Sequence, residues 1–205
     1  MSQRLTSSRA SSQIARYEAL LRARETVAAQ TPAGQPRHAA VFVLFAERGD
    51  EADVLLIRRP LDRGRHRGEW AFPGGVSERE DVSLLQTAFR ETEEELGIPA
   101  EFIEHWGALE PVSTNGTGFT VWPFTGRLLP GIELTPSADE VADVARVCTD
   151  DFCAPEMRRS ILMRRDGSVR SLHAYACGGR VIWGATARIL GQIFDGEPSA
   201  RAASA

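Results

Sequence analysis

One segment, from Phe72 to Ile98, limits what this chain can fold into more than any other. It begins with a Pro-Gly-Gly turn, continues through an acidic loop and ends in a stretch that predicts a helix. Gly97 follows that stretch and is the expected C-cap, because glycine adopts the left-handed conformation at low cost. Four apolar residues and one threonine recur at helical spacing and predict a single buried face. They are Leu85, Ala88, Phe89, Thr92 and Leu96.

The same helix carries three acidic residues close together. At about 100° per residue, Glu91, Glu94 and Glu95 fall within an arc of roughly 100°. Carboxylate oxygens suit Mg²⁺ or Mn²⁺, and Mg²⁺ commonly joins a few carboxylates to substrate phosphates. An acidic run on a helix is more often a solvated face, so the run alone leaves both interpretations open.

The turn, the acidic loop and the helical acids together resemble the signature of the Nudix hydrolases. Gly75 is followed after five residues by Asp81, and Arg90-Glu91, Glu94-Glu95 and Gly97-Ile98 match the second half of that signature. Asp81 stands where the family has glutamate, and the spacing from Asp81 to Arg90 is one residue longer than the general pattern. The longer spacing resembles the branch of the family that cleaves coenzyme A.

This resemblance implies an α+β fold of the Nudix type, an α/β/α sandwich with a mixed sheet between helices. It implies Mg²⁺ or Mn²⁺ as cofactor. The expected metal ligands are Glu91, Glu95, Glu94 and the carbonyl of Gly74, and the expected catalytic residues are Glu94, Arg90 and Asp81. Arg90 is expected to organise the site by pairing with a carboxylate. The general base stays open between Glu94, Asp81 and the loop acid Glu140.

A basic loop precedes the Pro-Gly-Gly turn. Residues 58–67 contain five arginines, interrupted by proline and glycine. Such a loop can serve solubility alone, but its position should bring it over the acidic helix, where it could bind a polyanionic phosphate ester. The expected substrate-binding residues are Arg59, Arg63, Arg65 and Arg67.

The same region carries the closer resemblance to coenzyme A diphosphatases. Leu55, Leu56, Arg59, Gly68 and the Phe72–Gly75 turn are in register with that branch. Short stretches around residues 118–126 and 182–190 are also similar to it. The sequence departs from the pattern at Ile57, Pro60 and Gly64.

Composition narrows the class of protein. All 24 basic residues are arginine, which excludes a lysine Schiff base and a P-loop with its phosphate-binding lysine. The net charge of -4 does not indicate nucleic-acid binding through a basic surface. We expect a cytoplasmic protein without a membrane span or signal peptide, with Cys148, Cys153 and Cys177 as reduced, buried apolar groups.

The remaining chain predicts one catalytic domain over residues 36–194, preceded by a tail and amphipathic helix in 1–35 and followed by a flexible tail in 195–205. Within these parts, a helix is expected over 12–29 and another over 184–194. Strands are expected over 39–46, 54–57, 106–109, 119–129, 140–147, 168–177 and 180–183, the last two forming a hairpin. Pro123 predicts that the strand over 119–129 is bent or lies at a sheet edge.

These expectations lead to one preferred function and two alternatives. The preferred function is cleavage of the diphosphate in coenzyme A or its derivatives, to 3',5'-ADP and phosphopantetheine products. The first alternative is hydrolysis of another nucleoside diphosphate derivative, such as ADP-ribose or NADH, at the same site. The second is a nucleotide-binding sensor without turnover. The expected partner is a small nucleotide derivative, neither a nucleic acid nor a membrane, and the chain could form a homodimer.

Overall fold

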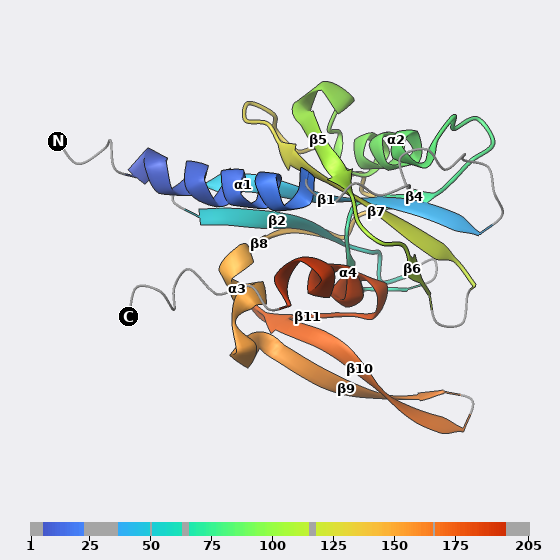
Figure 1. The fold of residues 1–205 in the computed structure, drawn as a ribbon. Helices are drawn as coiled ribbons and strands as arrows, with labels where there is room; N and C mark the ends of the chain where they lie inside the picture. The colour runs from blue at the N-terminus through green and yellow to red at the C-terminus, as the bar shows by residue number, and fades with distance from the viewer. Residues whose placement is uncertain are drawn as a thin grey trace.

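The computed structural model describes residues 6–22, 37–49, 51–62, 66–114, 118–165 and 167–195 (Figure 1). The helices are α1 (Thr6–Arg22), α2 (Leu84–Leu96), α3 (Thr149–Cys153) and α4 (Gly184–Phe194), with short 3₁₀ helices η2 (Ala100–Phe102) and η3 (Pro155–Met157). The first strands are β1 (His38–Arg48), β2 (Glu51–Arg58), β3 (Trp70–Ala71), β4 (Gly74–Val76) and β5 (Ile103–Ala108). The others are β6 (Val112–Ser113), β7 (Thr120–Leu128), β8 (Asp143–Cys148), β9 (Arg158–Arg165), β10 (Ser168–Cys177) and β11 (Arg180–Trp183).

The strands form two sheets. The larger one is mixed and has the order β3-β2-β1-β7-β5, with β4 also paired to β1, β6 to β7 and β8 to β2. β1 and β7 run parallel, whereas the other pairs in this sheet are antiparallel. The smaller sheet, β11-β10-β9, is antiparallel and projects away from the main body (Figure 1).

β1 is the centre of the core, as its apolar run predicts. Phe42 and Leu44 pack on one face of the sheet, together with the apolar face of α2. Val43 and Phe45 pack on the opposite face, with α1 and α4. Successive side chains of a strand point to opposite faces, so an unbroken apolar run is what a strand covered on both sides requires. The predicted α+β arrangement, with a mixed sheet between helices, is confirmed.

The position of Pro123 corrects one prediction. β7 lies inside the sheet, between β1 on one side and β5 and β6 on the other, and not at an edge. On the side of β7 opposite β1, the neighbouring strand changes from β6 to β5 at Pro123. Val121, before the proline, pairs with Val112 of β6, and Phe124, after it, pairs with Ala108 of β5. The carbonyl of Pro123 faces this break and accepts a hydrogen bond from the Leu109 amide at 2.8 Å. The proline nitrogen faces the same way, so its missing N–H falls where the ladder is already interrupted.

Other boundaries differ from the predictions in identifiable ways. α1 begins at Thr6 and not at residue 12, because its first turns contain no large apolar residue from which periodicity could predict a helix. Residues 23–36 lie outside the described ranges. Between β8 and β10 lie α3, η3 and β9, and none of these three was predicted. The hairpin β10–β11 and helix α4 occur where the sequence places them.

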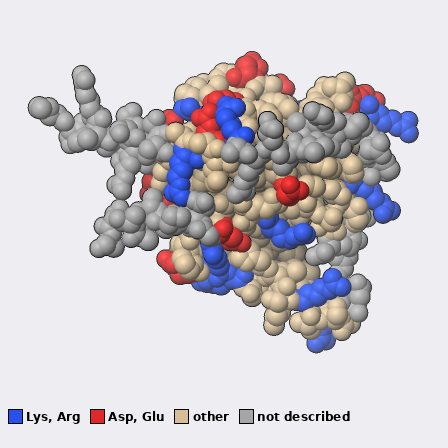
Figure 2. Space-filling model, in the orientation of Figure 1, with Lys and Arg blue, Asp and Glu red and all other residues tan. Residues whose placement is uncertain are grey.

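Two further expectations concern the interior and the surface. All three cysteines are free and buried, as predicted. Acidic and basic side chains are interspersed on the face shown in Figure 2. Within the described ranges, every helix is too short or too polar to span a lipid bilayer.

Candidate active site

Helix α2 has the C-cap and the buried face that its sequence predicts, and Ser83 is its N-cap. The Ser83 side chain accepts a hydrogen bond from the Gln86 amide at the N-terminus, and Gly97 has a left-handed φ of 66° at the C-terminus. Ala88, Thr92 and Leu96 are fully buried, and Leu85 and Phe89 are partly buried. The helix therefore has a fixed rotation about its axis, which determines where its acidic side chains point.

β4 brings the Pro-Gly-Gly turn under this helix. It pairs with the first residues of β1, whereas β2 pairs with the last residues of β1. Gly74 has a φ of 139°, and a Cβ there would collide with the backbone of Ala40 and Val41. A Cβ at Gly75 would collide with the Glu91 carboxylate. Gly74 is required because the turn lies directly against the backbone of β1, whereas a side chain at Gly75 would have to displace the Glu91 carboxylate on the α2 side.

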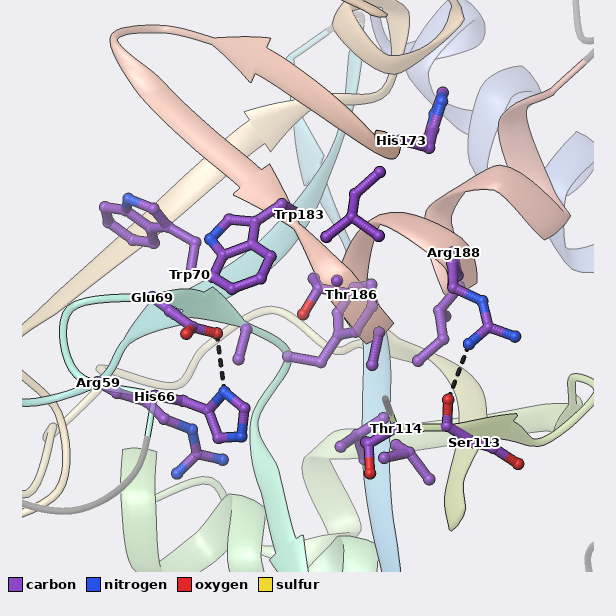
Figure 3. A pocket seen from close by; sticks show the side chains of 18 of the residues that line it. Arg59, His66, Glu69, Trp70, Ser113, Thr114, His173, Trp183, Thr186 and Arg188 are labelled. Atoms are coloured by element: carbon purple, nitrogen blue, oxygen red, sulfur yellow. Dashed lines mark hydrogen bonds and ion pairs between the residues drawn. The ribbon is translucent and has the colours of Figure 1, made fainter. Parts of the chain in front are cut away.

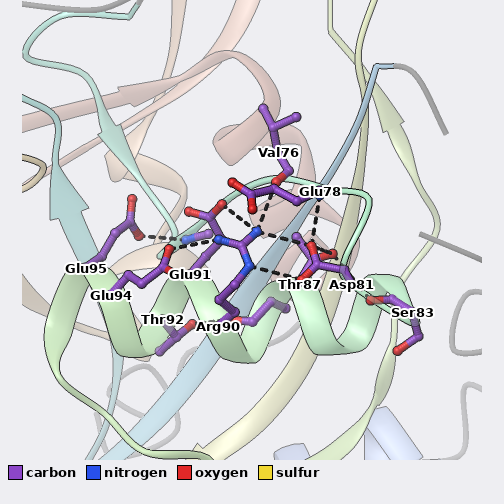
Figure 4. Close-up of polar contacts among 12 residues, drawn as sticks. Val76, Glu78, Asp81, Ser83, Thr87, Arg90, Glu91, Thr92, Glu94 and Glu95 are labelled. Carbon is purple, nitrogen blue, oxygen red and sulfur yellow. Dashed lines mark hydrogen bonds and ion pairs between the residues drawn. The ribbon is translucent and has the colours of Figure 1, made fainter. Parts of the chain in front are cut away.

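Two of the three helical acids point toward this turn. Glu95 is only 2 % exposed, and its Oε2 accepts a hydrogen bond of 2.8 Å from the Gly74 amide. Glu91 lies over Gly75 and has 15 % of its side chain exposed. Glu94 points outward, is exposed and forms an ion pair of 2.8 Å with Arg90 (Figure 4). The structure therefore brings Glu91 and Glu95 together at Gly74 and Gly75 and turns Glu94 away.

Arg90 lies among the acids and links them to the loop before the helix (Figure 4). Its Nε and Nη2 donate to the two oxygens of Asp81 at 3.0 and 3.1 Å, and Nη2 lies 3.1 Å from Glu91. Asp81 is buried and also accepts hydrogen bonds from the Thr87 hydroxyl and the Glu78 amide. In this arrangement Asp81 holds Arg90 in place, and Arg90 in turn contacts Glu91 and Glu94.

The environment shifts the pKa values of these carboxyls in opposite directions. Burial raises the pKa of Glu95 to about 8, although the Gly74 amide and the charge of Arg59 offset part of this shift. Burial also raises the pKa of Glu91, against the charge of Arg90. For Asp81, burial is outweighed by hydrogen bonds from Arg90, the Glu78 amide and Thr87, so its pKa is lowered. The exposed Glu140 lies near enough for its charge to raise the pKa of both Glu91 and Glu95.

The donor set at the turn fits a hard divalent cation. Among the described residues, no three histidine, cysteine or acidic side chains are grouped to hold a metal ion. Mg²⁺, however, usually takes only one or two protein carboxylates and completes its shell with waters and substrate phosphates. Glu91 and Glu95 supply two carboxylates, and a cation between them would offset the burial of both charges. Glu94 could join them only after leaving Arg90.

Next to this turn lies a cavity of about 600 Å³ on the α4 side of the sheet (Figure 3). Arg59 lines the cavity and donates a hydrogen bond of 3.2 Å to the Gly74 carbonyl. The amide of Gly74 donates a hydrogen bond to the Glu95 carboxylate. Of the other predicted substrate-binding residues, Arg63 and Arg65 lie outside the described ranges, and the exposed Arg67 does not line the cavity. Arg59 therefore connects the cavity with the acidic side of α2.

Sequence reasoning missed most of the cavity wall. Aromatic and polar residues from β3, β10, β11 and α4 contribute to it, and no local pattern joins them in the sequence. The wall residues that belong to stretches noted for their similarity to coenzyme A diphosphatases are Arg59, Phe72, Val121, Trp183, Gly184, Ala185, Thr186, Arg188 and Ile189. The missed residues include His66, Glu69, Trp70, Arg170 and His173.

Comparison with known proteins identifies the family. The NUDIX domain model matches residues 36–165. The Uncharacterized Nudix hydrolase NudL of Photorhabdus laumondii is 34 % identical over 157 residues, which cover 77 % of this chain and 83 % of that protein. The protein of the same description from Pectobacterium atrosepticum is 32 % identical, with coverage of 79 % and 83 %.

Among solved structures, a Nudix hydrolase from M. smegmatis, RenU, aligns with a TM-score of 0.47 and 28 % identity, covering 56 % of this chain and 73 % of that one. The family assignment rests on the domain model and on the two relatives, because these matches span most of each protein. On this evidence the chain belongs to the Nudix hydrolase family.

Proposed function

We propose that the protein is a divalent-metal-dependent hydrolase that cleaves the diphosphate of coenzyme A or a derivative, to 3',5'-ADP and a phosphopantetheine product. The observation that carries this proposal is the position of Arg59. Arg59 lines the 600 Å³ cavity, and its guanidinium also contacts the Gly74 carbonyl in the turn toward which Glu91 and Glu95 of α2 point. A diphosphate bound by Arg59 would have the carboxylates on one side and room for a nucleoside on the other.

The chemistry requires that negative charge on the diphosphate be offset before water can attack. A bound Mg²⁺ or Mn²⁺ supplies charge neutralisation and orients the reacting groups. Glu91 and Glu95 would hold the cation, with the Gly74 carbonyl as a further oxygen donor. Arg59 would orient the phosphate oxygens through its planar fork of donors.

Arg90 and Asp81 would act by positioning. Asp81 holds Arg90, and Arg90 holds Glu91 over Gly75, so the distance between the metal ligands depends on this pair. Glu94 and Glu140 are the candidate bases, since both are exposed and close to the buried carboxylates. A proton acceptor in contact with water can pass its proton to solvent, which a fully buried one cannot.

The cavity supports a substrate larger than a simple nucleotide. Its volume lies within the range of sites for small molecules and cofactors, and the partly exposed Trp183 offers a flat apolar surface to a base. The sequence similarity around Arg59, Gly68 and the Phe72–Gly75 turn adds to the preference for coenzyme A. ADP-ribose and NADH share the diphosphate and the adenosine, so they are the relevant competitors.

The test is a substrate panel with the purified protein and Mg²⁺. We expect coenzyme A to yield 3',5'-ADP and phosphopantetheine, identified by mass spectrometry, with a higher kcat/KM than ADP-ribose or NADH. If coenzyme A stays intact while ADP-ribose or NADH is hydrolysed, the substrate assignment is wrong. If none of the three is hydrolysed by wild type, the sensor alternative replaces the enzyme.

A further inference from the structure

The far side of the cavity is built by a part of the chain that lies beyond the NUDIX domain match. That match ends at residue 165, whereas β10, β11 and α4 occupy residues 168–194. These three elements supply residues at nine positions of the wall: Arg170, Leu172, His173, Trp183, Gly184, Ala185, Thr186, Arg188 and Ile189. The shape and charge of the far side therefore come from this segment.

The hairpin β9–β10 presents two different faces. Met163 pairs with Arg170 across the ladder, and both line the cavity together with Leu172. Arg164 pairs with Val169 on the opposite face, where Val169 is 56 % exposed. Alternation along the strands thus separates an inner arginine, Arg170, from an outer one, Arg164.

The charge of the cavity wall is positive beyond what a diphosphate at Arg59 needs. Among the described residues of the wall, the arginines are Arg59, Arg170 and Arg188, and the acidic residue is Glu69. Glu69 is engaged with His66, whose Nδ1 lies 3.0 Å from Glu69 Oε2. Arg59 lies at the Gly74 turn and is assigned to the diphosphate, so Arg170 and Arg188 are two further positive charges on the wall.

Arg188 is held in position on a side of the cavity away from Arg59 (Figure 3). Its Nη1 donates to the Ser113 carbonyl at 2.8 Å, which uses one of five guanidinium N–H donors. Arg188 and His173 also line a second, adjoining cavity, which contains the carboxylates of Glu110 and Asp195. An anion at Arg188 is therefore favoured on the side of the first cavity, where Arg170 adds its charge.

We propose that Arg170 and Arg188 bind an anionic group of the substrate that is not part of the diphosphate, with Trp183 beside them as a surface for the base. This inference rests on the proposed function and specifies it. In coenzyme A the group is the 3'-phosphate of the adenosine, which ADP-ribose and NADH lack. The cavity thus selects substrates by a phosphate remote from the bond that is cleaved.

The test uses ligands that need no turnover, so it stays informative even if coenzyme A is not a substrate. Calorimetric titration of the wild-type protein with 3',5'-ADP and with 5'-AMP compares two nucleotides that differ only in the 3'-phosphate. We expect 3',5'-ADP to bind about tenfold tighter, because its 3'-phosphate can accept charge-assisted hydrogen bonds that 5'-AMP cannot. Arg170→Ala and Arg188→Ala should each reduce this preference, and the double variant should abolish it.

Arg164→Ala is the matched control, because it removes an arginine from the outer face of the same hairpin and should leave the preference unchanged. Thermal unfolding of each variant confirms that it is folded. Arg170→Gln and Arg188→Gln provide a second pair of variants that keep more of each side chain.

The inference is overturned if wild type binds 3',5'-ADP and 5'-AMP with equal affinity, or if it binds neither nucleotide. A preference that survives in the double variant would also overturn it. If wild type prefers 3',5'-ADP over 5'-AMP but does not hydrolyse coenzyme A, the proposed function alone is refuted.

Discussion

The acidic side of α2 and the cavity differ in how the chain builds them. At α2, the residues Gly74, Asp81, Arg90, Glu91 and Glu95 belong to one segment and reach their positions through a turn, a helix and its caps. The cavity wall combines residues from Val41 to Ile189, which only the packing of two sheets and α4 brings together. We infer that the chemistry of the protein is encoded locally and its selectivity through tertiary structure.

The two regions also differ in how tightly their polar groups are bound. At α2, Glu95 and Asp81 are buried and hydrogen-bonded, so a substitution there should affect both stability and activity. In the cavity, Arg170 and Arg188 are exposed, and a substitution should change ligand affinity with little effect on folding. The following predictions test this contrast, in order of decreasing effect.

The largest effect is expected for Glu95→Gln. Loss of one carboxylate from a two-carboxylate metal site should lower kcat by about 10³-fold, which corresponds to about 4 kcal/mol of transition-state stabilisation. The measurement is turnover of coenzyme A with Mg²⁺. Glu93→Gln is the control, because Glu93 is exposed on the same helix, and its kcat should match wild type. Equal losses in both variants would mean that the effect comes from the helix and not from the site.

The next effect is expected for Gly75→Ala. The added Cβ would collide with the Glu91 carboxylate and displace it, which should lower kcat by about 10²-fold, as misplacement of a catalytic group commonly does. Steady-state kinetics measure this change. Wild type is the reference, because alanine at Gly131, where φ is 96°, would itself strain the backbone. Full activity of Gly75→Ala would show that Glu91 need not lie over the turn.

Arg90→Ala should destabilise the fold by about 2 kcal/mol, because it leaves the buried carboxylate of Asp81 without its charged partner. Urea unfolding, followed by tryptophan fluorescence, measures the free energy of unfolding. Arg79→Ala, at an exposed position in the preceding loop, should change it by less than about 0.5 kcal/mol. If Arg90→Ala is as stable as wild type, the contacts among Arg90, Asp81 and Glu91 are not what holds the helix to the loop.

Trp183→Ala should have the smallest of these effects and a different kinetic form. Loss of a stacking surface should raise KM for coenzyme A by about tenfold, since stacking of a base on an aromatic side chain is worth roughly 1–3 kcal/mol, while kcat changes little. Leu162→Ala, on the exposed outer face of the β9–β10 hairpin, is the control. A fall in kcat without a rise in KM would place Trp183 with the chemistry and remove the distinction between the two regions.

Sequence reasoning succeeded where structure depends on short-range spacing. The C-cap and buried face of α2, the doubly covered strand β1 and the bounds of α4 follow from periodicity and capping. The resemblance to a family signature also placed Glu91 and Glu95 on the side of α2 that meets Gly74 and Gly75. Their direction follows from the helix face, because the buried apolar residues fix the rotation of the helix.

It failed where the outcome depends on distant partners. Pro123 lies inside the sheet because β5 and β6 leave a break beside it, which no window around the proline can reveal. β9 is rich in arginine and pairs only with β10, so it lacks the apolar alternation of a buried strand. Arg59 reaches the cavity because it directly follows β2, whereas Arg67 lies in the turn beyond it, and composition does not distinguish the two.

Binding of Mn²⁺ tests the central claim, that Glu91 and Glu95 hold a divalent cation at the Gly74–Gly75 turn. Titration followed by electron paramagnetic resonance counts free Mn²⁺ and needs no substrate. We expect wild type and Glu93→Gln to bind equally, and Glu91→Gln and Glu95→Gln to bind at least about tenfold more weakly. Binding of Mn²⁺ to Glu91→Gln and Glu95→Gln as tightly as to wild type would contradict the account.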